Sequence, residues 1–537
     1  MEIAHKKAGI VEKIGYALGD GAANIAWRAV ATFLFIFYTD VFGLDPATVG
    51  MIMLIARFSD GVSDVLMGVI GDRTKSKHGH FRPWILWTAI PLAISLSLLF
   101  TTPAFGITGK IVYAYITYIL FTLIYTANNI PYGALMAVIT PDNKERTTFG
   151  SFRMVGAFAG GMLVQGALLL LVSYFGNVNP DIKMQQTGDK AYNLVVSSPR
   201  DVQNVNIKTE KGVAQFTWDT KCDSLPDQKA TTSKSFSMSA GKEYCFQVTG
   251  EPNLTAENIT LIDQRNGYSK AIYTLSVFLA VFMILTFLST RERVQPPAGQ
   301  ETNIWRDFKD LILNKPWIIL LIVGLLFNVY NNIKQGIVVI YFSHYINQQL
   351  MAGSYLVIIM IASIAGAMAT APLGKWLGKR NLFIAALIFS AIVNALLYLC
   401  GTQDVIAIFT LGAISEFGAA IFPTLFFAML GDVADYSEYK NGRRATGLIY
   451  SAGSFATKFG GGIAGAIIGF VLGAYGYNGQ DAAAIHLAIP GIKMLMSWIP
   501  SIIAIVAAVF MTMYPLPQAK LDLITHELNS RREKELM

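Results

Sequence analysis

The sequence contains few charged residues, cysteines and histidines. Only 14% of its 537 residues are charged, whereas a soluble domain carries about a quarter, so this composition argues against a water-soluble globular protein. The three cysteines and six histidines are scattered. We find no H-E-x-x-H, G-x-S-x-G or P-loop motif. These absences argue against an enzyme, and we expect no cofactor.

Apolar residues dominate the chain. They make up 53% of it, and the mean hydropathy is +0.46. Apolar runs long enough to cross a bilayer recur along the sequence, and we count about twelve. The predicted spans lie near 14–40, 47–71, 83–103, 110–139, 148–175, 269–290, 316–346, 353–376, 382–400, 404–432, 446–475 and 487–514. The chain is therefore predicted to be a multi-pass protein of the bacterial inner membrane, with lipid as its surroundings.

Positive charge is concentrated in alternate connections between the predicted spans. Basic clusters occur at 6–13, 73–82, 144–146, 291–293, 375–380, 440–444 and 531–534. The connections between them carry almost no basic residues, which is the pattern of cytoplasmic loops alternating with outer loops. We therefore expect both termini to be cytoplasmic. The net charge of +7 is explained by this pattern, and we expect no nucleic-acid partner.

A polar segment at 291–315, with prolines at 296 and 297, separates two halves of six predicted spans each. Two such halves indicate an internal duplication. The predicted fold class is an all-α membrane protein of about twelve transmembrane helices. Its expected parts are an N-terminal bundle (1–175), helix 6 (269–290), the cytoplasmic linker (291–315), a C-terminal bundle (316–514) and a cytoplasmic tail (515–537).

The segment 176–268 departs from the membrane pattern. It is polar, and short runs of alternating residues predict strands at 202–208, 213–218 and 244–248. We expect a small β-rich insertion, placed in the periplasm by the sidedness of the neighbouring spans. Cys222 and Cys245 both lie in it, and an oxidising compartment favours a disulfide between them.

The second predicted span carries Asp60 and Asp64, one helical turn apart, with Arg57 one turn before them. A charge near the bilayer centre costs about 2.5–3.5 kcal/mol on insertion scales. Two carboxylates on one helix face therefore predict a cation site in a transporter. A structural ion pair with Arg57 is the alternative.

Further polar side chains mark a lined cavity. Asp20, Asn24 and Arg28 form one stripe in the first span, with Trp27 beside it. The other candidates are Asn129, Tyr132, Arg153, Asn332 and Lys458. Amides, hydroxyls and aromatic rings suit a neutral polyol, although asparagine in a span also bridges neighbouring helices. For Lys334 and Glu416, the sequence allows either a structural ion pair or a functional role.

Several stretches together resemble the glycoside–pentoside–hexuronide:cation symporters of the major facilitator superfamily. They are YALGD (16–20), YTD (38–40), ARFSDGVSD (56–64), GDRTKSKHGHFRPW (71–84), NIPY (129–132), DVADYSEY (432–439) and GRR (442–444). The resemblance covers the membrane portion and leaves out the insertion. It implies two pseudo-symmetric six-helix bundles around a central cavity. It also implies import of a sugar with Na⁺ or H⁺ by alternating access, by a protein that we expect to be monomeric.

The resemblance also assigns residues. Asp60, Asp64 and Thr126 correspond to the cation site, and we expect no metal beyond a coupling Na⁺. Asn24, Asn129, Arg153 and Lys458 correspond to positions that line the sugar or the cavity. Asn24 and Asn129 stand where the melibiose carrier, a member of that family, has aspartates, which argues against melibiose itself. Arg28 adds a cation that would suit a uronate or a sulfated sugar.

Charged residues near the cytoplasmic ends of the spans are predicted to form a gate. They are Asp72, Arg73, Arg82, Asp432, Asp435 and Arg443. Their alternative role is to fix the topology of the chain in the membrane. For the whole protein, a carrier of lysolipids or other amphiphiles and a sugar sensor that does not transport are the competing hypotheses.

Overall fold

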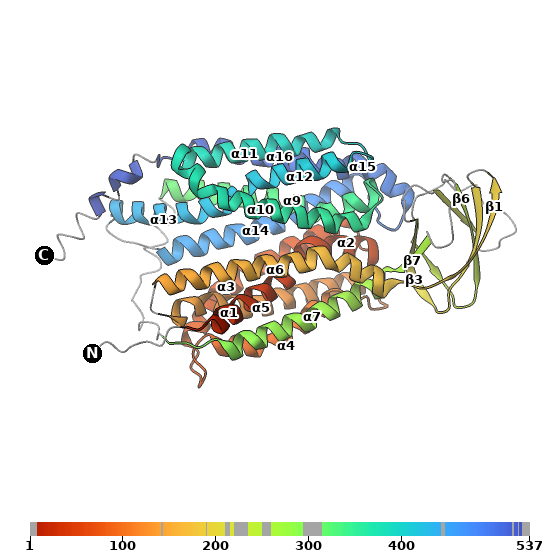
Figure 1. Cartoon of the computed structure of the whole chain (residues 1–537), viewed down its shortest axis with the longest axis horizontal. Coiled ribbons are helices and arrows are strands. Elements are labelled where there is room, and N and C mark those ends of the chain that lie inside the picture. Colours follow the sequence, from red (N-terminus) through yellow and green to blue (C-terminus); the bar gives the residue numbers. More distant parts are fainter. Residues whose placement is uncertain are drawn as a thin grey trace.

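A computed structural model shows a long helical body with a cap of strands at one end (Figure 1). The residues that it describes are 8–140, 143–188, 191–209, 215–219, 235–249, 259–293, 314–441, 446–517, 520–524 and 526–528. Most of the predicted linker, from 294 to 313, lies outside this part of the chain.

The helices of the first half follow the predicted spans closely. The first span is α1 (Ile10–Arg28), continued by η1 (Ala29–Phe33), α2 (Leu34–Ile36) and η2 (Phe37–Val41). The others are α3 (Pro46–Arg73), α4 (Arg82–Leu99), α5 (Ile107–Ile139), α6 (Asn143–Gly176) and α7 (Gln264–Ser289). Both η1 and η2 are π-helical turns, a feature common near functional sites.

The second half repeats this plan. Its helices are α9 (Lys315–Ile340) with η4 (Tyr341–Tyr345), α10 (Gln349–Leu377), α11 (Lys379–Leu396) with η5 (Leu397–Leu399), α12 (Val405–Ala419), α13 (Ile421–Asn441), α14 (Thr446–Ala474), α15 (Ala482–Met496) and α16 (Trp498–Thr512). Within the described residues, ten helical segments are long and apolar enough to cross a membrane. The other two of the twelve predicted spans fall on the long helix α3, which is not among these ten, and on α14, whose apolar stretch from Lys458 to Ala474 is shorter.

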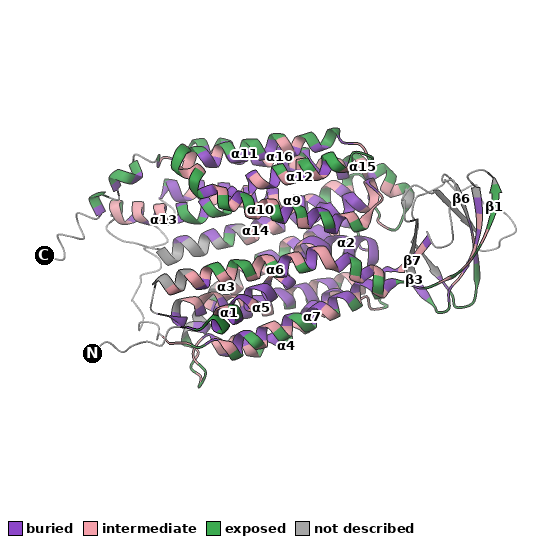
Figure 2. Ribbon diagram, viewed as in Figure 1, coloured by how far each residue is buried: buried purple, intermediate pink, exposed green. Residues whose placement is uncertain are grey.

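The helices form two bundles that lie side by side (Figure 1). In the first bundle α1 packs on α6 and α7, and α4 packs on α5 and α7; in the second, α9 packs on α14 and α16. The bundles meet where α3 contacts α14 and where α6 contacts α10. Large apolar side chains such as Val277 and Ile406 are exposed, as a lipid-facing surface requires. Exposed residues recur along the outer helices (Figure 2).

Glycines allow α1 and α6 to approach closely. A side chain at Gly156 would collide with the carbonyl oxygen of Ala17, and one at Gly160 with that of Gly21. Small residues at such a contact let two backbones pack against each other in a membrane. This contact positions α1, which supplies several of the predicted site residues.

The part of the insertion that the structure describes contains seven strands between α6 and α7: β1 (Asp181–Gly188), β2 (Ala191–Ser197), β3 (Val202–Thr209), β4 (Gln215–Asp219), β5 (Ser235–Met238), β6 (Glu243–Thr249) and β7 (Ile259–Asp263). They form two antiparallel sheets, ordered β1-β2-β6-β4 and β5-β3-β7. Leu194, Phe246 and Leu261 belong to their shared apolar core. Cys245 is disulfide-bonded, and its predicted partner Cys222 lies outside the described residues.

The strands are attached to both helices that flank them. The backbone N–H of Val178, just after α6, donates to the carbonyl oxygen of Leu261 at 3.1 Å. The side chain of Asp263 caps α7 by accepting from the backbone N–H of Asn266. Because the strands leave from the end of α6, they mark one end of the molecule, which we call the strand end. The connections after η2 and η4 lie at this same end.

Candidate functional site

The predicted acidic pair converges on one hydroxyl. The Oγ1 atom of Thr126 on α5 lies 2.7 Å from Oδ1 of Asp60 and 3.1 Å from Oδ1 of Asp64. Asp60 is 1% exposed. The turn-to-turn spacing on α3 puts both carboxylates toward α5, which α3 packs against. The structure therefore brings together all three residues of the predicted cation site.

Two cationic side chains balance the two carboxylates. Nη1 of Arg57 lies 3.3 Å from Oδ2 of Asp60, and the guanidinium sits 4.2 Å from the ring centroid of Trp27. Nζ of Lys458 lies 2.5 and 2.7 Å from the two carboxylate oxygens of Asp64, and 3.7 Å from Oδ1 of Asp60. The group is thus formally neutral. The predicted Arg57 pair and a convergent acidic site are both present.

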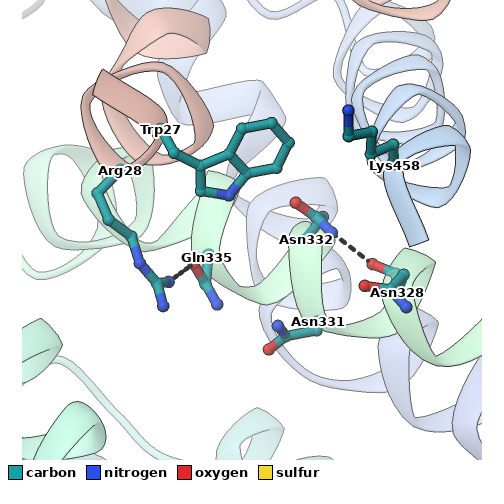
Figure 3. A pocket seen from close by; sticks show the side chains of 7 residues that line it. All are labelled: Trp27, Arg28, Asn328, Asn331, Asn332, Gln335 and Lys458. Carbon is teal, nitrogen blue, oxygen red and sulfur yellow. Dashed lines mark hydrogen bonds between the residues drawn. The ribbon is translucent and has the colours of Figure 1, made fainter. Parts of the chain in front are cut away.

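Lys458 also lines a cavity between the bundles. This cavity has a volume of about 140 Å³ and is lined by Trp27, Arg28, Asn328, Asn331, Asn332, Gln335 and Lys458 (Figure 3). Trp27 and Arg28 come from α1, four amide side chains come from α9, and Lys458 comes from α14 (Figure 3). The lining is mostly polar and offers one large ring. Such a cavity can hydrogen-bond a polyol and cover one of its apolar faces.

Four of the nine predicted substrate residues line this cavity: Trp27, Arg28, Asn332 and Lys458. The structure adds Asn328, Asn331 and Gln335, polar residues of the same predicted span that were not among the nine. With Asn332 they lie at i, i+3, i+4 and i+7 on α9, one face of a helix. That spacing was the signal that could have identified all four together.

The other five predicted residues are not among those that line the cavity. Nε of Arg153 on α6 lies 3.2 Å from Oδ2 of Asp20 on α1, which closes a second ion pair within the first bundle. Asn24 donates to the backbone oxygen of Asp20 at 3.0 Å. Tyr132 is fully buried against Tyr16.

Asn129, the fifth, is half-buried on α5. Lys334 and Glu416, left open above, form a third ion pair, with 3.2 Å between Nζ and Oε2. Ser363 and Ser415 complete that network inside the second bundle. Neither member of this pair lines the cavity.

The predicted gate residues make their described contacts within single bundles. Asp432 on α13 pairs with Lys379 of α11 at 2.7 Å. Arg82 donates to the carbonyl oxygen of Phe287 on α7 at 2.7 Å. Arg73 is exposed and Asp435 is half-buried. The side chain of Asp72 and the whole of Arg443 lie outside what the structure describes.

A further polar contact between the bundles lies at the strand end. Asp40 in η2 of the first bundle meets His344 in η4 of the second, with 2.6 Å between Oδ2 and Nε2. The hydroxyl of Tyr477, in the connection after α14, donates to Oδ1 of Asp40 at 2.7 Å. Gln480 donates to the backbone oxygen of Asp40 at 3.2 Å. Together these contacts, here called the strand-end latch, hold the two bundles closed at that end.

Comparisons with solved structures support the transporter fold. The chain superposes on a bacterial homologue of the human lysosomal transporter Spinster, in an inward-facing and unoccupied conformation, with a TM-score of 0.61 at 11% identity over 94% of this chain and 95% of that one. It also matches the nucleoside transporter NupG, with a TM-score of 0.57 at 12% identity, over 94% and 99% of the two chains.

Sequence comparisons extend this to relatives of similar length. The chain is 28% identical to the inner membrane symporter YicJ of Escherichia coli (strain K12), over 98% of this chain and 94% of that protein. It is 27% identical to the isoprimeverose transporter of Lactiplantibacillus pentosus, over 91% and 85%. It is 26% identical to the glucuronide carrier protein homolog of E. coli (strain K12), over 97% and 95%.

The family model described as MFS/sugar transport protein matches residues 15–198 and 235–518. This match confirms the resemblance drawn from the sequence motifs. It also confirms the expectation of a transporter in place of an enzyme, and relatives and apolar helices agree on a multi-pass inner-membrane protein. The chain therefore belongs to the MFS/sugar transport protein family of symporters.

Proposed function

We propose that this protein imports a glycoside, pentoside or hexuronide together with Na⁺ or H⁺ by alternating access. The observation that carries this proposal is that Lys458 takes part in both the acidic site and the cavity. Its ammonium binds Asp64 of the acidic pair, and the same residue lines the cavity. One side chain thus connects the expected cation site with the expected sugar site.

The geometry supports a specific coupling step. A Na⁺ ion at the acidic pair, or a proton on Asp64, neutralises the charge that holds the ammonium of Lys458. Arg57 continues to balance Asp60, because their contact does not involve Lys458. The released ammonium can then donate hydrogen bonds to a sugar hydroxyl in the cavity, since it lines that space already. Cation and sugar consequently favour the same state of the carrier.

The cavity supports a polar, ring-shaped cargo. The four amides of α9 can donate to and accept from hydroxyls, and the indole of Trp27 can cover an apolar sugar face. Side chains from both bundles contribute, so the site is complete only in some arrangements of the two. A lysolipid carrier would need an apolar compartment, which this lining does not provide. The names of the isoprimeverose and glucuronide relatives also support a sugar.

The strand-end latch supports alternating access. With Asp40 held by His344 and Tyr477, the bundles are joined at the strand end, while the described gate pairs at the other end stay within one bundle. We assign the strand end to the periplasm and the other end to the cytoplasm. The described state then corresponds to a carrier closed toward the outside.

Transport by purified protein in vesicles tests the proposal. Radiolabelled glycosides, pentosides and uronides are offered outside, with an imposed Na⁺ gradient, an imposed proton gradient or neither. We expect accumulation of at least one sugar only with one of the gradients, and a membrane potential should increase it, because each 100 mV contributes about 2.3 kcal/mol per charge. Binding of a sugar without accumulation under any gradient would instead identify a sensor.

A further inference from the structure

Arg28 differs from the other cations near the site. Each of the others lies within 4 Å of a carboxylate, in the pairs Arg57–Asp60, Arg153–Asp20, Lys334–Glu416 and Lys458–Asp64. Arg28 instead donates from Nη1 to the neutral amide oxygen of Gln335 at 2.5 Å. Its Nε is buried and has no hydrogen-bond partner. Among the described residues, no carboxylate lies within ion-pair distance of this guanidinium.

A buried cation without a counter-charge is costly. Removing a charge from water costs several kcal/mol unless another charge or a set of hydrogen bonds replaces the solvent. Glu416 attracts the guanidinium without contacting it, and its carboxylate is bound by Lys334 at 3.2 Å and by Ser363 at 3.1 Å. Arg28 lines the cavity, so a molecule inside the cavity lies beside this side chain. A ligand in the cavity could therefore supply the missing counter-charge.

A second unmatched group lies on the same cavity wall. Oδ1 of Asn331 is buried and accepts no hydrogen bond, and Asn331 and Gln335 lie one turn apart on α9 (Figure 3). A lone acceptor there suits a hydroxyl donor, while the free Nε of Arg28 suits an acceptor. An anionic oxygen next to a hydroxyl group in the same ligand would offer hydrogen-bond partners to both side chains.

We propose that the sugar carried by this protein bears a carboxylate or a sulfonate, and that Arg28 is the residue that selects it. The proposal rests on the proposed function, because it assumes that the cavity binds the transported sugar. The guanidinium presents a planar set of donors that matches either anionic group. Gln335 orients the guanidinium, and Asn331 accepts from a neighbouring sugar hydroxyl. Since Arg28 is on α1 and both amides are on α9, the anionic end of the ligand would connect the two bundles.

The test compares sugars that differ at one group. Binding is measured by calorimetry on the purified protein in lipid nanodiscs, using methyl pyranosides whose terminal carbon carries a hydroxyl, a carboxylate or a sulfonate, in both the gluco and the galacto series. We expect one of the anionic sugars to bind at least tenfold more tightly than its hydroxyl counterpart, which corresponds to about 1.4 kcal/mol. The ratio of affinities is the readout, so a general loss of binding in a variant cancels.

Variants of Arg28 test whether this residue causes the preference for anionic sugars. We expect Arg28→Gln to reduce the ratio at least tenfold and Arg28→Lys, which retains the charge, to preserve most of it. Lys183→Gln is the matched control, since it removes one positive charge from the exposed surface of β1. A ratio near one in the unmodified protein, or an unchanged ratio in Arg28→Gln, would overturn the proposal. Should Arg28→Gln not fold, the ratios of the unmodified protein and of Arg28→Lys decide the outcome.

The same measurements separate this inference from the proposed function. If neutral sugars bind and accumulate under a cation gradient while anionic sugars do not bind more tightly, the symporter proposal stands and the role of Arg28 is wrong. If no sugar of either kind binds or accumulates, the proposed function itself fails.

Discussion

The ammonium of Lys458 on α14 lies between the two carboxylate oxygens of Asp64 on α3, at 2.5 and 2.7 Å. These residues are 394 positions apart in the chain and belong to different bundles. Because α3 and α14 form a direct contact between the bundles, the charge state of Asp64 affects how tightly the bundles are held together. In the proposed function, cation binding and bundle movement would therefore act on the same pair of residues.

Replacing Lys458 with alanine is the most direct test of this coupling. Without the ammonium, the acidic pair carries a formal charge of −1 beside Arg57, so we expect the half-saturating concentration of the coupling cation to fall about tenfold, or about 1.4 kcal/mol. The dependence of sugar binding on the cation should disappear. Both are measured by titrating purified protein with cation and sugar in turn.

Lys110→Ala provides the matched control for Lys458→Ala. It also removes an ammonium, but one that donates to the carbonyl oxygen of Phe42 at the strand end. We expect this control to retain cation-dependent sugar binding. Sugar affinity that still rises with the cation in Lys458→Ala would contradict the exchange of partners proposed for this lysine.

The two aspartates of the acidic pair should differ in their effect on stability. Asp60→Asn leaves Arg57, whose side chain is 5% exposed, without its counter-charge, and losing one partner of a buried pair costs about 3–5 kcal/mol. Asp64→Asn leaves Lys458 facing the cavity, where water can replace the lost partner. Thermal unfolding in detergent should therefore show the larger decrease for Asp60→Asn.

Both aspartate variants should lose accumulation driven by a cation gradient. This is measured in vesicles that contain equal amounts of protein. Full concentrative uptake by both variants would remove the acidic pair from the coupling mechanism. Equal unfolding temperatures would show that Arg57 does not depend on Asp60.

The acidic pair was predictable from sequence because its parts are local or strongly constrained. Asp60 and Asp64 are one turn apart on α3, and a hydrophobic helix presents few alternatives for two carboxylates. The bounds of the spans followed from apolar runs for a similar reason. The partner of Asp64 was not predictable, because Lys458 reaches it only through the packing of α14 on α3.

Asp20 and Arg153 form an ion pair with each other, so we expect their substitutions to compensate. Arg153→Gln leaves the buried carboxylate of Asp20 unbalanced and should lower the unfolding temperature. Combining it with Asp20→Asn should recover at least half of that loss, because the double variant buries no unpaired charge.

The outcome also decides between two roles for Arg153. If Arg153→Gln unfolds at the normal temperature but its half-saturating sugar concentration rises about tenfold, Arg153 contacts the sugar, as the sequence analysis predicted. A change in stability with nearly unchanged sugar binding would assign it to the packing of α1 on α6.

Asp40→Ala should open the strand end of the molecule more often. The substitution removes the carboxylate that meets His344 and accepts from Tyr477 across the bundles. Spin labels at the exposed positions Phe105 and Gln403, in a Cys400→Ser background, report the distance between the bundles at that end. We expect a larger population of long distances in the variant.

Asp45→Ala is the control for this measurement. Asp45 lies close to Asp40 in the chain but accepts from Thr48 within the first turn of α3, so its loss should leave the distance distribution unchanged. Identical distributions for Asp40→Ala and the unmodified protein would show that the latch does not hold the strand end closed.

The cavity shows why sequence alone selects too many site residues. Spacing on a helix reveals which side chains share a face, but the same spacing serves a face turned toward a cavity and one turned toward another helix. Asn328, Asn331, Asn332 and Gln335 face the cavity, whereas Asp20 and Arg153 bind each other. Only the packing of α1 and α6 through Gly156 and Gly160 makes that distinction.

The attachment of the strands has a practical consequence. The strands connect to α6 near Val178 and to α7 at Asp263, and both helices pack in the first bundle. If the bundles rotate relative to each other, as the proposed function requires, the sheets must move with the first bundle. A nanobody or fluorophore bound to these sheets would therefore report the orientation of the first bundle relative to the second.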